Sequence, residues 1–270
     1  MIYPTISEYI EAIKSAEDNF EQLKNLRPVL DKDGQPVMTG GNFAVVFKMR
    51  DERDGKCYAV KCFTKEQEGR AEAYREITKE LDNVLSLYLT SVQFFDKELF
   101  VDTDQTTDTE FPILLMGWVK GKTLDKYLRG NLDDRYTLEM LAYRFSLLAQ
   151  WLIPQPYAHG DLKPDNILVR EDGTLVLVDY DGMYVPAMKG QKARELGSPD
   201  FRHPQRTEDD FVEMLVNGCK IKVHHALALL KEKYPLKREK DFEYNNLLQM
   251  IMNSFFVDTY LSKDIRVPLY

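Results

Sequence analysis

The sequence predicts an α+β fold made of a β-rich first part and a mainly helical second part. Between residues 37 and 119, short apolar runs of strand type alternate with polar turns. From residue 137 onward, apolar residues recur mostly at helical spacing. The length of 270 residues fits one domain of two lobes or two small domains. We therefore expect a cleft between two lobes.

Composition excludes several classes of function. A net charge of -8 argues against general nucleic-acid binding and against binding to anionic membranes. Cys57, Cys62 and Cys219 form no zinc-binding pattern, which predicts free thiols in a reducing compartment. The chain has no apolar run of about 18 residues and no signal-peptide pattern at its start. These observations predict a cytoplasmic protein.

Residues 1–36 are predicted to form a helix and a connector. Thr5 and Glu8 have the spacing of a capping box, and apolar residues then recur at helical period as far as Leu23. We expect an amphipathic helix over residues 6–26 that packs on the first lobe. A partner-binding role for this helix is the alternative. Residues 28–36 form the connector.

Residues 37–119 are predicted to be strand-rich with one helix. Residues 45–49 and 57–63 flank a polar turn and predict a hairpin. Helical periodicity covers residues 66–89. Further strands are predicted at 94–95, 99–101 and 113–116, with a polar excursion over 102–110.

Residues 120–270 are predicted to be mainly helical. A strongly apolar helix covers 137–153, with Thr137 as its N-cap. Strand-like runs follow at 167–169 and 175–178, and later helices are predicted at 223–234 and 243–257. Because little sequence follows Gln205, we expect the lower part of this lobe to be reduced.

The segment from His159 to Asn166, HGDLKPDN, concentrates the chemistry of the chain. Asp161 is a candidate general base, because a carboxylate can orient a hydroxyl and accept its proton. Lys163 could neutralise charge on transferred phosphoryl oxygens. Asn166 and the later Asp179 offer oxygen ligands of the kind that Mg²⁺ takes beside phosphates. Together these residues suit phosphoryl transfer from a metal-bound nucleotide.

At these residues the chain resembles the protein kinase catalytic loop, whose usual pattern is HRDLKxxN. The resemblance implies a bilobal kinase-like fold, with residues 37–119 as the β-rich N-lobe and 120–270 as the helical, reduced C-lobe. Asp179-Tyr180-Asp181 stands in the place of the family's DFG. It implies that Asp179 chelates Mg²⁺, that Tyr180 fills the apolar role of the phenylalanine, and that Asp181 is an exposed acid or a further metal ligand, of which we favour the first.

The resemblance extends into the first lobe. Lys61 in Ala59-Val60-Lys61 matches the strand lysine that holds nucleotide phosphates, and Glu76 is its expected ion-pair partner, with Glu72 as the fallback. Residues 39–46 occupy the place of the glycine-rich loop, where Gly40 and Gly41 would let backbone N–H groups approach phosphates. Only Gly41 coincides with a family glycine.

The remaining nucleotide contacts are also implied by the resemblance. Residues 116–119 match the hinge that binds adenine through its backbone, with Met116 as the gatekeeper. The implied ATP-binding set is Met38, Gly40, Gly41, Val46, Ala59, Lys61, Met116, Gly117, Trp118, Val119 and Leu168.

Several residues depart from the family pattern. Gly160 replaces the arginine that reads phosphorylation of the activation loop, which predicts an enzyme that needs no such phosphorylation. Ser198 matches the threonine that contacts the base and the lysine. Gln205 replaces the family's glutamate, and Asp209 or Asp210 is the candidate brace of the catalytic loop.

The predicted function is an ATP- and Mg²⁺-dependent serine/threonine protein kinase of an atypical, bacterial-like type, acting on an unknown protein substrate. A small-molecule phosphotransferase of the aminoglycoside- or choline-kinase kind is an alternative, although these enzymes usually lack the equivalent of Lys163. A nucleotide-binding pseudokinase or scaffold is the other alternative. Fold alone does not decide among them.

Overall fold

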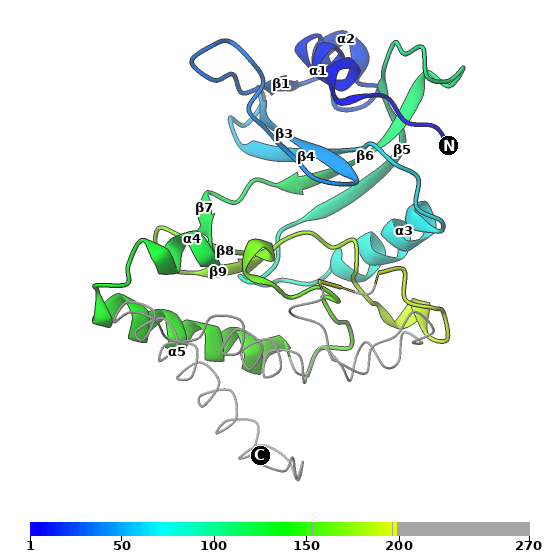
Figure 1. Cartoon of the computed structure of the whole chain (residues 1–270). Helices are drawn as coiled ribbons and strands as arrows, with labels where there is room; N and C mark the ends of the chain where they lie inside the picture. The colour runs from blue at the N-terminus through cyan, green and yellow to red at the C-terminus, as the bar shows by residue number, and fades with distance from the viewer. Residues whose placement is uncertain (153, 196, 199–270) are drawn as a thin grey trace. The chain divides into compact units, whose positions relative to one another are not determined.

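The computed structural model describes residues 1–152, 154–195, 197 and 198, and it divides into two compact units. The first unit comprises residues 1–85 and 90–118, and the second comprises residues 86–89 and 119 onward. The α+β class is confirmed, because strands dominate the first unit and the longest helix lies in the second (Figure 1).

The first unit is built on a six-stranded antiparallel sheet. Its strands are β1 (Leu26–Pro28), β2 (Met38–Gly40), β3 (Ala44–Asp51), β4 (Cys57–Phe63), β5 (Val92–Phe100) and β6 (Glu110–Gly117). The order is β1-β3-β4-β6-β5, and β2 pairs with β3 outside this path. The predicted hairpin is confirmed as β3 and β4. The two runs predicted at 94–95 and 99–101 belong to the single strand β5, whose register shifts between Phe95 and Leu99.

The start of the chain forms two short helices in place of one long helix. The capping box at Thr5 and Glu8 is confirmed and begins α1 (Ile6–Lys14). Ser15 leaves helical geometry, with φ -106° and ψ 43°, and α2 (Ala16–Asn19) follows. The prediction of a helix to residue 26 was therefore wrong, because the apolar spacing continues where the backbone turns into β1.

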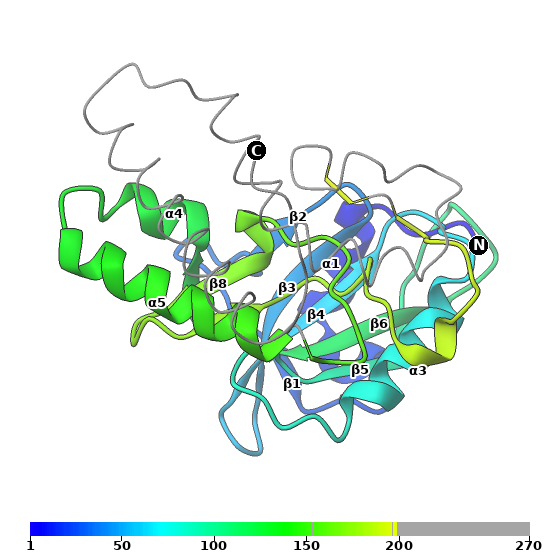
Figure 2. The ribbon, with the colours of Figure 1, turned by 90° about the horizontal axis from the view of Figure 1, so that it is seen from below.

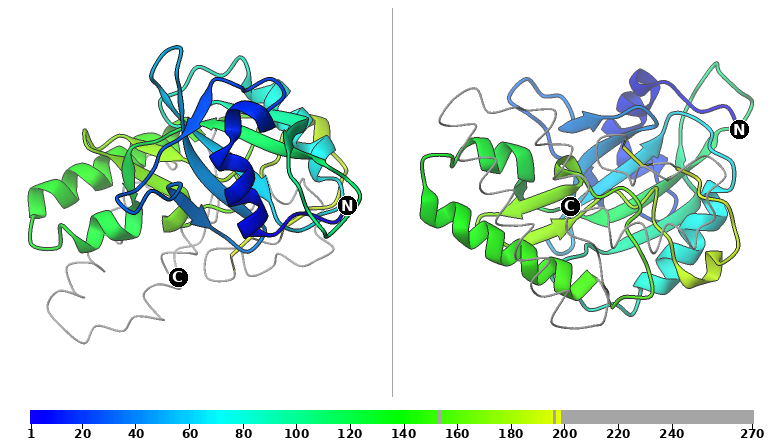
Figure 3. Two further views of the ribbon diagram at one scale, coloured as in Figure 1. Left: turned by 90° about the horizontal axis from the view of Figure 1, so that it is seen from above. Right: turned by 60° about the horizontal axis from the view of Figure 1, so that its bottom comes forward.

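These two helices cover one face of the sheet (Figure 3, left). Tyr9, Ile13 and Phe20 are buried in one cluster with the inward side chains of β3, β4, β5 and β6. The Tyr9 hydroxyl donates a buried hydrogen bond of 2.7 Å to the Phe63 carbonyl. The predicted packing of the N-terminal helix on the first lobe is thus confirmed, and its buried side chains belong to the core of this unit.

Helix α3 (Arg70–Leu81) is shorter than the predicted helix of residues 66–89. It begins after Gly69, whose φ of 71° is not helical. It packs against β5, where the rings of Tyr74 and Phe94 stack with centroids 6.1 Å apart. Leu85, which completed the apolar pattern in the sequence, is fully exposed. The apolar periodicity of the sequence therefore extends beyond the end of the helix.

The second unit contains a three-stranded antiparallel sheet of β7 (Gly121–Thr123), β8 (Ile167–Arg170) and β9 (Leu175–Leu177). Helix α4 (Leu124–Arg129) packs on β7 and β8, and α5 (Arg135–Leu152) packs on β9 (Figure 2). The N-cap predicted at Thr137 was wrong by one turn, because the Asp134 carboxylate accepts the Thr137 N–H at 3.1 Å. The described part of the unit also contains two short 3₁₀ helices, η1 (Pro164–Asn166) and η2 (Pro186–Met188).

Other predictions fall on residues that the structure does not describe. The helices at 223–234 and 243–257, the reduced lower lobe, Gln205, and the brace at Asp209 or Asp210 lie outside the described residues. Among the helices of the described residues, none has the length and apolarity needed to cross a membrane.

A buried carboxylate ties the N-terminal segment to the sheet. Glu98 on β5 is 1% exposed, and its Oε1 accepts the backbone N–H groups of Gln22 at 2.8 Å and Leu23 at 2.7 Å. Its Oε2 is buried and has no hydrogen-bond partner among the residues that the structure describes. Burial raises the pKa of Glu98, and the two amides offset this only in part.

We expect Glu98→Gln to leave stability within about 1 kcal/mol of wild type at pH 8, because one acceptor remains and no charge is buried. Glu98→Ala should cost about 2–4 kcal/mol, because two buried amides lose their partner. Since the folded-state pKa is raised, the contribution of Glu98 is fully present below the unfolded-state value and is lost as pH rises through the folded-state value. The stability of wild type relative to Glu98→Gln should therefore increase as the pH falls toward about 4.3.

Urea unfolding at several pH values measures this difference. Exposed Glu110 on β6 provides the matched control, Glu110→Gln. Equal losses of stability for Glu98→Gln and Glu98→Ala would contradict the role assigned to Glu98.

Candidate active site

The catalytic-loop segment of the second unit is held by backbone hydrogen bonds on both sides of η1. Pro164 occupies the first turn of η1, where its lack of an N–H leaves no bond unmade. The Asn166 N–H donates to the Lys163 carbonyl at 3.0 Å, and the Val178 N–H donates to the Asn166 carbonyl at 3.0 Å. The second bond places the end of β9, and with it Asp179, beside Asn166 in this unit.

Asp161 is the centre of the site and is 8% exposed. Its Oδ1 accepts the backbone N–H of Ser198 at 2.7 Å, and its Oδ2 forms an ion pair with Lys163 Nζ at 2.8 Å. Lys163 Nζ also donates to Ser198 Oγ at 3.1 Å. The contacts that the sequence predicted for Ser198 are therefore present, and they fix the direction of the carboxylate.

The electrostatics keep both Asp161 and Lys163 charged. Burial raises the pKa of the Asp161 carboxyl, but the hydrogen bonds from Lys163 and Ser198 outweigh it, so the net pKa lies below the usual value. Burial lowers the pKa of Lys163, but the bond to Asp161 outweighs it, so that pKa is raised. An ionised carboxylate can accept a hydrogen bond from a hydroxyl and orient it, and the cation beside it can offset charge on a phosphoryl group.

Asn166 has the orientation that a metal ligand requires. Its Nδ2 donates to the Asp161 carbonyl at 2.9 Å and to Asp161 Oδ2 at 3.3 Å. No hydrogen bond from the described residues occupies its amide oxygen, which is thus available to a hard cation. Asp179, the other predicted metal ligand, follows Val178, whose N–H donates to the Asn166 carbonyl. The described residues hold no cluster of three or more His, Cys, Asp or Glu that could bind a metal.

His159 and Tyr180 pack against each other and support the catalytic-loop segment. His159 is completely buried, and its Nε2 lies 2.9 Å from the Val178 carbonyl. Tyr180 packs edge-on against it with ring centroids 6.0 Å apart, and its hydroxyl donates to the Leu177 carbonyl at 3.1 Å. Tyr180 is buried, as the sequence predicted. Between them, Asp179 adopts a left-handed backbone with φ 66°, the sort of sparsely populated geometry that clusters at functional sites.

Gly160 explains why this chain lacks the family's arginine. Its φ is 81°, and a Cβ atom at this position would collide with the carbonyl oxygen of Gly182. No residue with a side chain can therefore occupy position 160 in this backbone. A two-bond backbone pair between Ala158 and Tyr184, at 3.0 and 2.8 Å, holds the same two segments together.

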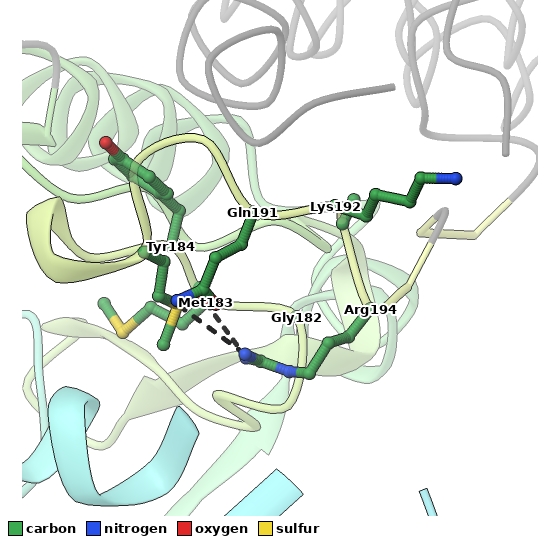
Figure 4. A pocket seen from close by; sticks show the side chains of 8 residues that line it. Gly182, Met183, Tyr184, Gln191, Lys192 and Arg194 are labelled. Carbon is green, nitrogen blue, oxygen red and sulfur yellow. Dashed lines mark hydrogen bonds between the residues drawn. The ribbon is translucent and has the colours of Figure 1, made fainter. Parts of the chain in front are cut away.

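Asp181 corrects one prediction. The sequence favoured an exposed acid, but Asp181 is 9% exposed. It begins a loop that returns to Arg194, whose Nη2 donates to the carbonyls of Asp181 and Met183, each at 3.3 Å. Figure 4 shows Arg194 turned toward Met183. A small pocket is lined by Gly182, Met183, Tyr184, Met188 and residues 191–194. The sequence did not predict the contacts of Arg194 or the close approach of Gly182 to Gly160, because only folding brings these segments together.

In the first unit, four of the predicted nucleotide residues share one face of the sheet. In β3, β4 and β6, alternate side chains enter the core cluster below α1 and α2. The other set points to the opposite face, since neighbours along a strand alternate. This set contains Val46, Ala59, Lys61 and Met116, and register joins Lys61 to Val46 and Ala59 to Met116. Lys61 is 7% exposed, so it is not an ordinary solvent-facing strand lysine.

The glycine-loop segment forms a tight hairpin between β2 and β3. Met38 pairs with Phe47, which faces the helices, so it does not share the face of Val46; Thr39, opposite Val46, does. The sequence missed Thr39, because a one-residue shift of register reverses the faces. A Cβ atom would meet nothing within 4 Å at Gly40 and only an ordinary contact at Gly41. The fold does not require these glycines, which supports a role in close approach by a ligand.

Glu76 lies half-buried on α3, in the same unit as Lys61. Its ion pair with Lys61 stays a prediction. Glu72, the fallback partner, is exposed and lies 3.5 Å from Arg75. Its position on the solvent side of α3 makes it the weaker candidate.

The predicted hinge residues fall at the boundary of the two units. The Gly117 carbonyl accepts the Thr90 hydroxyl at 2.9 Å, and the Trp118 N–H donates to Cys57 at 3.1 Å. Val119 is buried in the second unit, where Leu168 on β8 is half-buried.

Comparison with known proteins decides the family. The model of the protein kinase domain matches residues 36–253. The chain belongs to the protein kinase family. Protein kinases use ATP and a divalent metal, and this chain carries a kinase domain whose relatives are serine/threonine kinases.

Three relatives illustrate the distance of this protein kinase from known members. Serine/threonine-protein kinase OXI1 of Arabidopsis thaliana is 27% identical over 145 residues, or 52% of this chain and 34% of the relative. The catalytic subunit of cAMP-dependent protein kinase of Dictyostelium discoideum is 23% identical over 207 residues, 75% of this chain and 29% of the relative. Human 3-phosphoinositide-dependent protein kinase 1 is 28% identical over 189 residues, which cover 68% of this chain and 32% of the relative. The chain spans about a third of the length of each.

The coupling of Asp161 and Lys163 in this kinase predicts a titration behaviour. Lys163→Met removes the cation and leaves the burial, so the pKa of Asp161 should rise. Since the folded-state pKa of Asp161 is lowered in wild type, the stability it contributes is present above its unfolded-state pKa of about 3.9 and is lost as pH falls through the folded-state value. Carbon-13 NMR of aspartate carboxyls measures the midpoint. Exposed Lys189→Met is the control, and an unmoved midpoint in Lys163→Met would contradict the account.

Proposed function

We propose that this chain transfers the γ-phosphoryl group of ATP to a serine or threonine hydroxyl of a protein. The observation that carries the proposal is the Asp161 carboxylate, ionised and aimed by Lys163 and Ser198. The acceptor hydroxyl would give its proton to Asp161 as its oxygen bonds to phosphorus and the bond from phosphorus to the ADP oxygen breaks. Lys163 would offset the charge on the transferred group.

One set of residues would hold the nucleotide phosphates, and another set would hold the metal. Lys61, with Glu76 as its partner, would hold phosphates, and Gly40 and Gly41 would allow a close backbone approach. Asn166 and Asp179 would hold Mg²⁺, which supplies charge neutralisation at the phosphates when it is bound.

The adenine base would contact apolar side chains and the backbone of the hinge. Val46, Ala59 and Met116 support this assignment by sharing one sheet face. The residues proposed to complete the set are Gly117, Trp118, Val119 and Leu168. Met38 receives less support because its register partner faces the other way.

A protein acceptor is favoured over a small-molecule acceptor. Lys163 is fixed in an ion pair with Asp161, and it is this lysine that small-molecule phosphotransferases with a similar loop usually lack. We name no partner for the N-terminal helix, since its apolar face is used in the core. The named relatives do not support a bacterial-like subtype, and the cytoplasmic location remains a proposal.

Transfer from γ-labelled ATP·Mg²⁺ to three kinds of acceptor tests the substrate class. Generic protein acceptors, a panel of small hydroxyl metabolites, and water would be offered to the same preparation. We expect label on serine and threonine of proteins. Label on metabolites alone would overturn the protein-kinase proposal, and bound nucleotide without any transfer would support a pseudokinase.

A further inference from the structure

The loop that follows the metal-binding aspartate has a cation of its own. Arg194 is half-buried, and its guanidinium donates hydrogen bonds to the carbonyls of Asp181 and Met183. Figure 4 shows its side chain extended toward Met183. Its Nη1 lies 3.6 Å from the Met188 sulfur. One planar side chain therefore connects the end of the loop to its start. The guanidinium can do this because it holds several hydrogen-bond donors in a fixed planar geometry.

The start of that loop is also fixed to the catalytic loop. Tyr184 exchanges two backbone hydrogen bonds with Ala158, and Gly182 packs so closely on Gly160 that no side chain fits there. The end of the loop reaches Asp161 through Ser198. Arg194 therefore connects two segments that each contact the catalytic loop.

We propose that Arg194 is a positioning residue that keeps the segment from Asp179 to Met183 in its catalytic arrangement without phosphorylation of the loop. The inference rests on the proposed function. Position 160 cannot carry an arginine, so the catalytic loop has no cation there to bind a phosphate on the activation loop. Arg194 instead holds the start of the loop through hydrogen bonds from within the same loop. Its hydrogen bonds to the Asp181 and Met183 carbonyls use backbone groups, which are present in every phosphorylation state.

The direction of the effect follows from the geometry. Asp181 is two residues beyond Asp179, whose backbone is in a sparsely populated region that its surroundings must hold. Loss of the Arg194 contacts would free the Asp181 and Met183 carbonyls and let Asp179 reorient. The proposed metal ligand would then be misplaced, and divalent-cation binding would weaken together with transfer.

Two variants separate the effect of the guanidinium hydrogen bonds from the effect of the positive charge. Arg194→Met keeps a long side chain without donors, and Arg194→Lys keeps the charge without the planar guanidinium. Lys192→Met is the matched control, since Lys192 is an exposed cation that lines the same pocket. All variants would be treated with phosphatase, verified as unphosphorylated by mass spectrometry, and tested for folding by thermal unfolding.

Mn²⁺ binding in the presence of ADP, followed by electron paramagnetic resonance, is the readout that does not depend on activity. We expect Arg194→Met to weaken Mn²⁺ binding about tenfold or more and to raise amide exchange at Met183 and Tyr184, while Lys192→Met matches wild type. In transfer assays kcat should fall by up to about 100-fold, the scale of a small misplacement of reacting groups. Arg194→Lys should be intermediate.

Unchanged Mn²⁺ binding and amide exchange in folded Arg194→Met would overturn the inference. So would wild type that binds Mn²⁺ only after phosphorylation of its loop. If wild type transfers no phosphoryl group to any acceptor, the proposed function fails, whereas the metal-binding and exchange results still decide the role of Arg194.

Discussion

Asp161→Asn should reduce phosphoryl transfer by about 10²–10⁴-fold, the usual contribution of a general acid or base. The amide retains the shape of the carboxylate, and its oxygen can still accept the Ser198 N–H, so we expect the fold to survive. It cannot accept a proton from the acceptor hydroxyl. Steady-state transfer with thermal unfolding on the same preparation measures both effects.

The control for this variant lies in the same loop. Asp165→Asn removes an exposed carboxylate four residues away and should leave transfer near the wild-type rate. A similar loss in both variants would show that loop charge in general, rather than the Asp161 base, governs activity.

Gly160→Ala should destabilise the protein more than any other glycine-to-alanine substitution in the described part of the second unit. The new Cβ would meet the Gly182 carbonyl, and φ of 81° is unfavourable for alanine. The left-handed backbone alone costs about 1–2 kcal/mol. The collision adds to this cost, because the Ala158–Tyr184 bonds prevent the two segments from separating freely. We therefore expect a loss of more than about 2 kcal/mol and a larger loss of transfer.

Gly190→Ala separates the two causes. Gly190 has nearly the same φ of 82°, but a Cβ atom there would meet nothing within 4 Å. It should lose only the cost of the backbone and retain activity. If urea unfolding gives equal losses for both variants, the close approach of Gly160 and Gly182 is not a constraint.

Local patterns predicted the elements whose two faces differ. The β3–β4 hairpin and the β8–β9 pair were predicted because each has apolar runs separated by a polar turn. Helix ends were less predictable. Leu85 extends the apolar period of α3 but is exposed, and Ser15 breaks a pattern that continues to Leu23.

The individual contacts of the site followed the sequence only where they are local or where a motif specifies them. Asp161, Lys163, Asn166 and Ser198 meet as the motif implied. The burial of Asp181 depends on a loop that returns from Arg194, which no spacing in the sequence records. The face of Met38 depends on a one-residue choice of register in a short hairpin.

The most direct test of the account is a comparison of wild type with Asp179→Asn, measuring nucleotide binding and γ-phosphoryl transfer to protein side by side. Asparagine tolerates the left-handed backbone of this position, so the fold should be kept. The account predicts that unphosphorylated wild type transfers the phosphoryl group to serine or threonine and that Asp179→Asn loses transfer while remaining folded. Wild type that binds nucleotide and transfers nothing, or Asp179→Asn that transfers at the wild-type rate, would contradict it.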